Sequence, residues 1–150
     1  MLCPFTTGTR SQLGENIAEI QPLAAGPREH LFQEIDNIKP VGDTPLYDAV
    51  NTGFDYMQAR AEPGRNTAIV VLSDGENNAS STTIEALESK MRGSSESGDR
   101  TPVRVFPIVY TGDAPPEALT RIAVASGGQV FDAKDPRRLR ATLASVFSNF

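Results

Sequence analysis

Residues 68–75 read Ala-Ile-Val-Val-Leu-Ser-Asp-Gly, and this stretch decides the fold. Five consecutive apolar residues without alternation are typical of a strand that is buried on both faces, as in a parallel sheet. The Ser-Asp-Gly that follows directly is typical of a turn at the end of such a strand. We therefore expect residues 68–72 to form a central strand of an α/β domain.

Helical and strand patterns alternate around this strand. The clearest amphipathic stripe runs from Leu46 to Met57, with apolar residues at i, i+3, i+4, i+7, i+8 and i+11. The remaining patterns from residue 46 onward predict helices over 84–91, 119–123 and 139–150, and strands over 103–110 and 129–131. This alternation indicates a Rossmann-like α/β fold, a mostly parallel sheet with helices on both faces.

Other segments give weaker or more local predictions. Weak strand patterns occur at 2–5 and 17–23, and a helical one at 31–38. Pro107 cannot donate to a strand ladder, so we expect its strand to be bulged or to lie near a sheet edge. Residues 93–98, Gly-Ser-Ser-Glu-Ser-Gly, predict a flexible connector. The expected core includes residues of four elements: Val70, Leu72, Phe54, Ile108 and Ile122.

Composition excludes several classes of function. The 150 residues suit one domain, and 14 basic against 19 acidic residues give a net charge of −5. That balance argues against nucleic acid or an anionic membrane as the main partner. One cysteine and one histidine exclude an internal disulfide, a Cys-rich zinc site and most His-based triads. We expect neither a signal peptide nor a membrane-inserted segment in the chain, and nothing in it indicates a compartment.

Two polar clusters stand where open parallel sheets bind ligands, beyond the carboxyl ends of strands. One is residues 73–78, Ser-Asp-Gly-Glu-Asn-Asn, and the other is residues 42–46, Gly-Asp-Thr-Pro-Leu. Carboxylate and hydroxyl oxygens on converging loops suit a hard cation such as Mg²⁺. Each cluster also has a simpler interpretation, since Thr44 before Pro45 suits a helix N-cap and Asp74 before glycine suits a turn.

Three motifs occur in an informative order: residues 42–49 (Gly-Asp-Thr-Pro-Leu-Tyr-Asp-Ala), residues 69–75 and residues 105–109 (Val-Phe-Pro-Ile-Val). Together they resemble the later part of a von Willebrand factor type A (VWA) domain. The tail is similar to that family's last helix, strand and helix, and Leu2–Phe5 resembles its second strand. The resemblance implies one partial VWA-like domain over residues 1–150 that binds a partner protein.

The VWA family carries a metal-ion-dependent adhesion site that is formed by three loops. The resemblance places the second-loop threonine at Thr44 and the third-loop aspartate at Asp74, with Asp43, Ser73 and Gly75 shaping the loops. It implies Mg²⁺, or Mn²⁺ or Ca²⁺, bridging to an acidic residue of the partner protein.

The family's first loop has the motif Asp-x-Ser-x-Ser, and no aspartate in this sequence begins that motif. We therefore expect the chain to begin after the first strand of the family, and the metal site to be incomplete and to bind weakly or not at all. Loss of a central strand would also leave two open sheet edges and an uncovered apolar strip. Open edges recruit further strands, so a homo-oligomer that closes the gap is expected.

We expect a binding module and not an enzyme, and two alternatives stay open. A metal-assisted phosphohydrolase would need a second carboxylate near Asp74, for which Asp43 and Glu76 are available. A subunit of a chelatase-like assembly is the other alternative, because VWA-type domains also occur there. Phosphoester turnover that is lost in Asp74→Ala would favour the enzyme. An acidic partner residue whose mutation abolishes binding would favour adhesion.

Overall fold

The computed structural model describes residues 43–96, 101–110, 116–133, 135, 141 and 144. The elements in these ranges follow one another as helix α3 (Leu46–Gln58), strand β1 (Thr67–Ser73), helix α4 (Ile84–Glu96), strand β2 (Val103–Val109), helix α5 (Glu117–Ala125) and strand β3 (Phe131–Asp132). The predicted alternation and the α/β class are confirmed over this part of the chain. The predictions at 2–5, 17–23, 31–38 and 139–150 lie outside the described residues, apart from residues 141 and 144.

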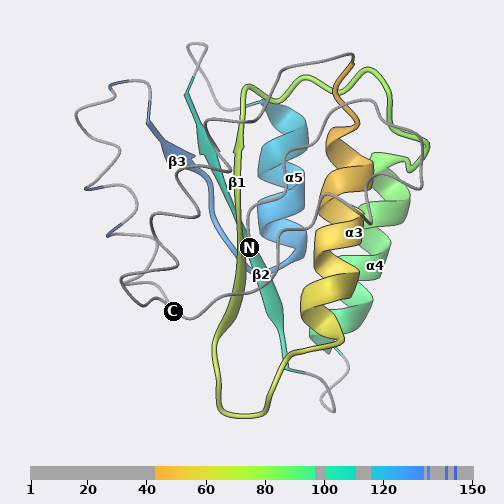
Figure 1. Ribbon diagram of the computed structural model, residues 1–150, viewed down its shortest axis with the longest axis vertical. Helices are drawn as coiled ribbons and strands as arrows, with labels where there is room; N and C mark the ends of the chain where they lie inside the picture. The colour runs from red at the N-terminus through yellow and green to blue at the C-terminus, as the bar shows by residue number, and fades with distance from the viewer. Residues whose placement is uncertain are drawn as a thin grey trace, which may run out of the picture.

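The three strands form one parallel sheet in the order β1-β2-β3. β1 and β2 pair from Thr67 with Val103 to Ser73 with Val109, whereas β3 joins β2 only at its end. Each strand lies beyond the previous one, and parallel crossovers are right-handed, so α4 and α5 lie on one face of the sheet. α3 lies on that face too, and its first turn is at the end of the molecule where β1 ends (Figure 1).

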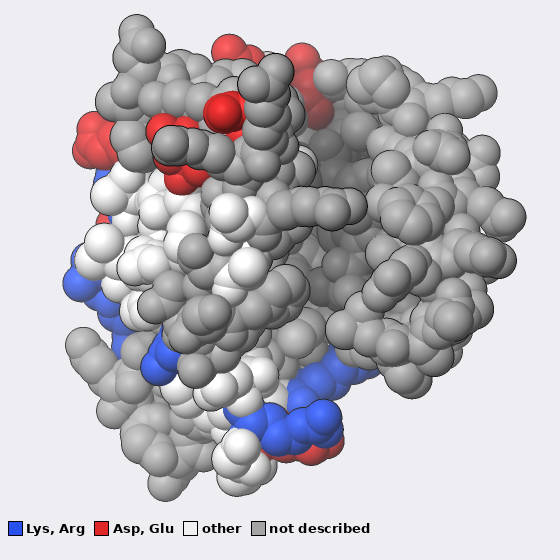
Figure 2. Space-filling view, turned by 90° about the vertical axis from the view of Figure 1, so that its left-hand side faces the viewer, with Lys and Arg blue, Asp and Glu red and all other residues white. Residues whose placement is uncertain are grey.

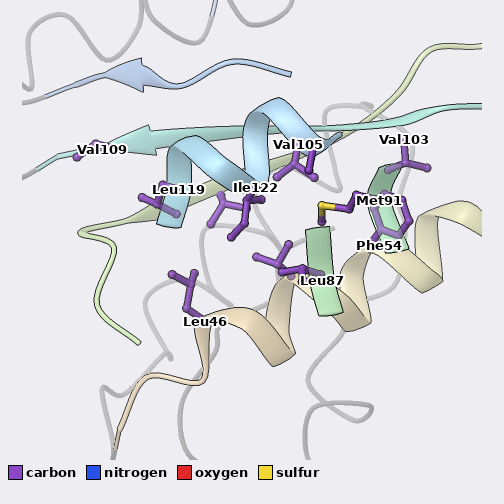
Figure 3. Close-up of a cluster of buried hydrophobic side chains, with 12 residues drawn as sticks. Leu46, Phe54, Leu87, Met91, Val103, Val105, Val109, Leu119 and Ile122 are labelled. Atoms are coloured by element: carbon purple, nitrogen blue, oxygen red, sulfur yellow. The ribbon is translucent and has the colours of Figure 1, made fainter. Parts of the chain in front are cut away.

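A hydrophobic core fills the space between the sheet and the three helices (Figure 3). The stripe predicted for α3 faces this core, and Phe54 is buried as expected. Ile122 of α5 is also buried, as expected. Further fully or nearly fully buried side chains come from β1, α4, β2 and α5: Val71, Leu87, Met91, Val103, Val105, Val109 and Leu119. Ile108, also predicted as core, is buried on the opposite sheet face with Phe106 and Ala133.

Two residues predicted for the core are exposed instead, since Val70 is 41% and Leu72 is 53% accessible. β1 is an edge strand of the described sheet, and these two side chains point away from the three helices. Val71 and Ser73, which alternate with them, are buried on the helix side. The central strand of the described sheet is β2, in which six of seven residues are buried. An uninterrupted apolar run therefore did not identify the strand that is covered on both faces.

Pro107 lies in the central strand, and the prediction of a bulge or an edge position is wrong. The pairing of β1 with β2 is continuous through it, with Val71 opposite Pro107. The N–H of Val105 and the C=O of Val109 both point to the β3 side, so the Pro107 nitrogen points there as well. β3 pairs with β2 only from Ile108 onward. Because Pro107 comes before this pairing starts, the backbone N–H that proline lacks would have had no partner in β3.

The predicted connector at 93–98 is also wrong for its first part, because α4 continues to Glu96. The hydroxyl of Ser94 is buried and donates to Oε1 of Gln58 in α3, at 2.5 Å. This contact gives the last turn of α4 a partner in the neighbouring helix. No helix within the described ranges is both long and apolar enough to span a bilayer.

Candidate functional site

Two loops meet at the carboxyl edge of the sheet, one that leads into α3 and one (residues 74–82) that follows β1. The N–H of Thr44 donates to Oδ1 of Asn78 at 2.6 Å, and the N–H of Asn78 donates to the carbonyl of Thr44 at 3.1 Å. These residues are 34 positions apart in the sequence. The two segments predicted to converge therefore lie against each other, with Thr44 on one loop and Asp74 on the other.

The first turn of α3 is capped by the other loop. Its N-cap residue is Pro45, whose side chain makes no capping hydrogen bond. The hydroxyl oxygen of Ser80 accepts from the N–H groups of Tyr47, at 2.9 Å, and Asp48, at 3.2 Å. The same hydroxyl donates to Oδ1 of Asn77. The interpretation of Thr44 as the N-cap is therefore wrong, because the unpaired N–H groups of the helix start are satisfied by loop 74–82.

Asp48, in the first turn of α3, makes a further link to loop 74–82. Its Oδ2 accepts from the N–H of Ser81 at 2.8 Å and from its hydroxyl at 3.0 Å, while Oδ1 accepts from the N–H of Thr82 at 2.8 Å. Burial opposes ionisation of this carboxyl, but the hydrogen bonds from Thr82 and Ser81 outweigh it and lower the pKa of Asp48. The carboxylate is therefore charged at neutral pH.

The start of loop 74–82 is shaped by turn chemistry. The hydroxyl oxygen of Ser73 is buried and accepts from the N–H of Gly75 at 3.0 Å, and Oδ1 of Asp74 accepts from the N–H of Glu76 at 3.1 Å. Gly75 has a φ of +90°, and a Cβ there would lie 2.3 Å from Cγ of Pro116. Only glycine fits this conformation and this approach. These contacts support the loop-shaping roles of Ser73 and Gly75, which stay predictions.

Tyr110 follows β2 at the same edge, directly after Val109, which pairs with Ser73 at the start of loop 74–82. Burial raises the pKa of Tyr110, and the negative charges of Asp74 and Glu76 raise it further. On the face shown in Figure 2, acidic side chains lie mostly toward the top and basic ones toward the bottom. The top of this view is also the end where β1 stops and α3 starts.

The donors of the predicted metal site fit a hard cation in kind. The Thr44 hydroxyl and the Asp74 carboxylate offer oxygen, which Mg²⁺ and Ca²⁺ prefer. Mg²⁺ takes about six oxygen ligands. Among the described residues, however, no three His, Cys, Asp or Glu side chains are grouped in a way that could hold a metal ion. Asp43 is exposed next to Thr44. The described part of the chain thus supplies the right donor type but few donors.

The family model of the von Willebrand factor type A domain matches residues 11–145. The chain belongs to the von Willebrand factor type A domain family. The predicted family is confirmed, and so is the Rossmann-like α/β class that the VWA family shares with the parallel sheet described above. The metal-binding roles of Thr44 and Asp74 in this VWA domain stay predictions.

One solved structure that is similar to this VWA chain is the crystal structure of an uncharacterized membrane spanning protein from Vibrio fischeri. The TM-score is 0.42 at 17% sequence identity, and the match covers 81% of this chain and 65% of that chain. This chain therefore spans just under two thirds of the length of that protein chain. No curated protein matches this chain in sequence.

Four residues at this edge had no site role predicted from the sequence: Asp48, Asn77, Ser80 and Tyr110. A signal for Asp48 exists, because it stands inside the Thr-Pro-Leu-Tyr-Asp segment that identified the family. Asn and Ser residues after a strand are typical of loops whose side chains bind backbone groups. Which backbone they bind depends on the tertiary arrangement, so the sequence alone does not reveal the cap on α3.

Proposed function

We propose that this VWA domain is a protein-binding module whose recognition surface is the loop edge that carries Thr44 and Asp74. The paired hydrogen bonds between Thr44 and Asn78 carry the proposal, because they hold two loops from distant parts of the sequence as one surface. In parallel α/β sheets, this edge is where ligands bind. The exposed Tyr110 beside it adds an aromatic side chain, a residue type that is enriched at protein interfaces.

We further propose that the partner's acidic side chain is bound through a divalent cation. Thr44 and Asp74 would hold Mg²⁺, Mn²⁺ or Ca²⁺, and water and the partner's carboxylate would supply further oxygens. Thr44 gives a neutral lone pair and Asp74 gives the one negative charge of this pair. Because so little charge offsets the dehydration of the ion, we expect the cation to bind the chain as given only in the millimolar range.

The experiment is a calorimetric titration with Mn²⁺, without and with a short glutamate-containing peptide. If the carboxylate of the peptide binds through the metal, each ligand must raise the affinity for the other by the same factor. We expect millimolar Mn²⁺ binding that is strengthened by the peptide and lost in Asp74→Ala. The matched control is Asp55→Ala, which removes an exposed carboxylate of α3 that pairs with Lys90.

Equal Mn²⁺ binding by both variants would overturn the proposed site. Submillimolar binding by the unmodified chain would overturn the two-donor description and would point to a further carboxylate. No observation on the described residues favours a phosphohydrolase or a chelatase-like subunit over a binding module.

A further inference from the structure

The hydrogen bonds of Asp48 point to a role in the site that is separate from holding the cation. We infer that Asp48 is a positioning residue, whose carboxylate clamps loop 74–82 to the start of α3 and so holds the loop that carries Asp74 against the segment that carries Thr44. The inference rests on the proposed function, because positioning matters only if Thr44 and Asp74 act together. It adds a residue that contacts neither the cation nor the partner.

The anchor of this clamp is rigid. Asp48 lies in the first turn of α3, between the buried residues Leu46 and Ala49, so its backbone is fixed by the packing of the helix on the core. Both of its carboxylate oxygens are engaged, one with Thr82 and the other with Ser81. The carboxylate therefore fixes two consecutive residues of the loop to the helix at once.

The clamp acts on the far part of the loop. At its near end, loop 74–82 continues from Ser73 of β1, and the middle of the loop binds α3 and the residue before Pro45 through neutral groups of Asn78 and Ser80. Asp48 is the charged acceptor among the contacts described between this loop and α3. Hydrogen bonds to an ionised acceptor are roughly twice as strong as neutral ones. Loss of the carboxylate should therefore release Ser81 and Thr82 first, and loosen the Ser80 cap next.

The geometry also explains why an amide cannot replace the carboxylate. Donors approach both oxygens of Asp48, so the NH₂ group of an asparagine would face an N–H on one side in either orientation. Asp48→Asn keeps the size of the side chain but breaks one half of the clamp. Asp55→Asn is the matched control, because it removes the same charge from the same helix at the Lys90 ion pair, away from the loop. Asp48→Glu restores the carboxylate.

The first measurement is amide hydrogen exchange by NMR on the full chain. In Asp48→Asn, the amides of Ser81 and Thr82 should exchange roughly tenfold faster than in the unmodified protein, since local opening of the loop becomes easier. Asp55→Asn should leave both rates unchanged, and Asp48→Glu should recover part of the protection. Unchanged exchange in Asp48→Asn would overturn the clamp.

The second measurement separates positioning from a merely structural role. Mn²⁺ is paramagnetic and broadens nearby amide signals even when it binds weakly. In the unmodified protein, Thr44 and Asp74 should broaden together; in Asp48→Asn, broadening at Thr44 should fall at least about twofold relative to Asp74 as the loops separate. Equal broadening in both proteins would overturn the positioning role. Absence of any local broadening in the unmodified protein would overturn the proposed function and the positioning role together, and accelerated exchange would then still support the clamp itself.

Discussion

Gly128 passes so close to Val105 that a Cβ on the glycine would lie 2.0 Å from the carbonyl oxygen of Val105. The turn after α5 is fixed against β2 at this point. The hydroxyl of Ser126 accepts from the N–H of Val105 and donates to the carbonyl of Ala123, both at 2.9 Å. The N–H of Gly128 donates to that same carbonyl at 2.8 Å. The Ser-Gly-Gly sequence therefore allows β2 to be covered by a turn where β3 does not yet pair with it.

Gly128→Ala should be strongly destabilising, because backbone atoms of the central strand would have to move. We expect a loss of more than about 3 kcal/mol in the free energy of unfolding, measured by urea denaturation. Gly93→Ala is the control, since that glycine lies within α4 and no atom would contact its Cβ. It should stabilise the protein by roughly 1 kcal/mol. A similar small effect of both substitutions would contradict the close approach.

Leu72 and Ile108 are direct partners in the parallel register, yet they differ in burial. Leu72 is 53% accessible and Ile108 only 1%. We expect Ile108→Ala to cost about 2–5 kcal/mol of stability through lost burial and a cavity. Leu72→Ala and Val70→Ala should each cost roughly 0.5 kcal/mol or less. Urea denaturation of the three variants checks this, and a large loss in Leu72→Ala would mean that β1 is covered on this face.

The contrast between these two residues shows what the sequence could predict about the fold. The stripe on α3 and the strands at 68–72 and 103–110 follow from local patterns, which is why they were predicted correctly. The order of strands across the sheet does not follow from such patterns. The apolar run of β1 predicted a central strand, but the most buried of the described strands is β2, which contains Arg104 and Pro107. How many strands lie beside a given strand depends on the tertiary structure, which local sequence patterns do not reveal.

The site divides in the same way. Thr44 and Asp74 could be named from motifs, because both stand in loops next to well-predicted elements. The contacts that join those loops could not be predicted from motifs. Asn78 and Ser80 look like ordinary loop residues unless the position of α3 beside them is known. The same applies to Asp48, whose partners are more than 30 positions away.

Asn78 should contribute measurably to stability through its bond to Thr44. Asn78→Ala removes the acceptor of a 2.6 Å hydrogen bond, and we expect a loss of about 1 kcal/mol in the free energy of unfolding. Asn78→Asp is the matched control, because its carboxylate keeps an acceptor for the Thr44 N–H. Thermal unfolding of the two variants distinguishes them. Equal stability of Asn78→Ala and the unmodified protein would show that water replaces the side chain without cost.

Asp48 should make stability depend on pH in the acid range. Its hydrogen bonds hold the pKa of the folded state below the ordinary value of 3.8, so folding favours the ionised form. The stabilisation is therefore fully present above 3.8 and is lost as the pH falls through the folded pKa. Asp48→Asn should be less stable by roughly 1–2 kcal/mol near neutral pH, and this difference should shrink below 3.8. Urea unfolding over a pH series tests this, and a difference that does not vary with pH would contradict it.

Self-association is expected at the edge of β1. Within the described sheet this strand pairs only with β2, and Val70 and Leu72 are exposed beside its open side. An edge strand with exposed apolar side chains recruits other strands, whereas a lysine there discourages pairing. We therefore expect concentration-dependent oligomers in sedimentation velocity, weakened by Leu72→Lys. Val124→Lys is the control, because Val124 is 61% accessible on α5 and away from the strand edge. If the protein is a monomer at every concentration, or if Leu72→Lys and Val124→Lys weaken the oligomers equally, the β1 edge does not mediate assembly.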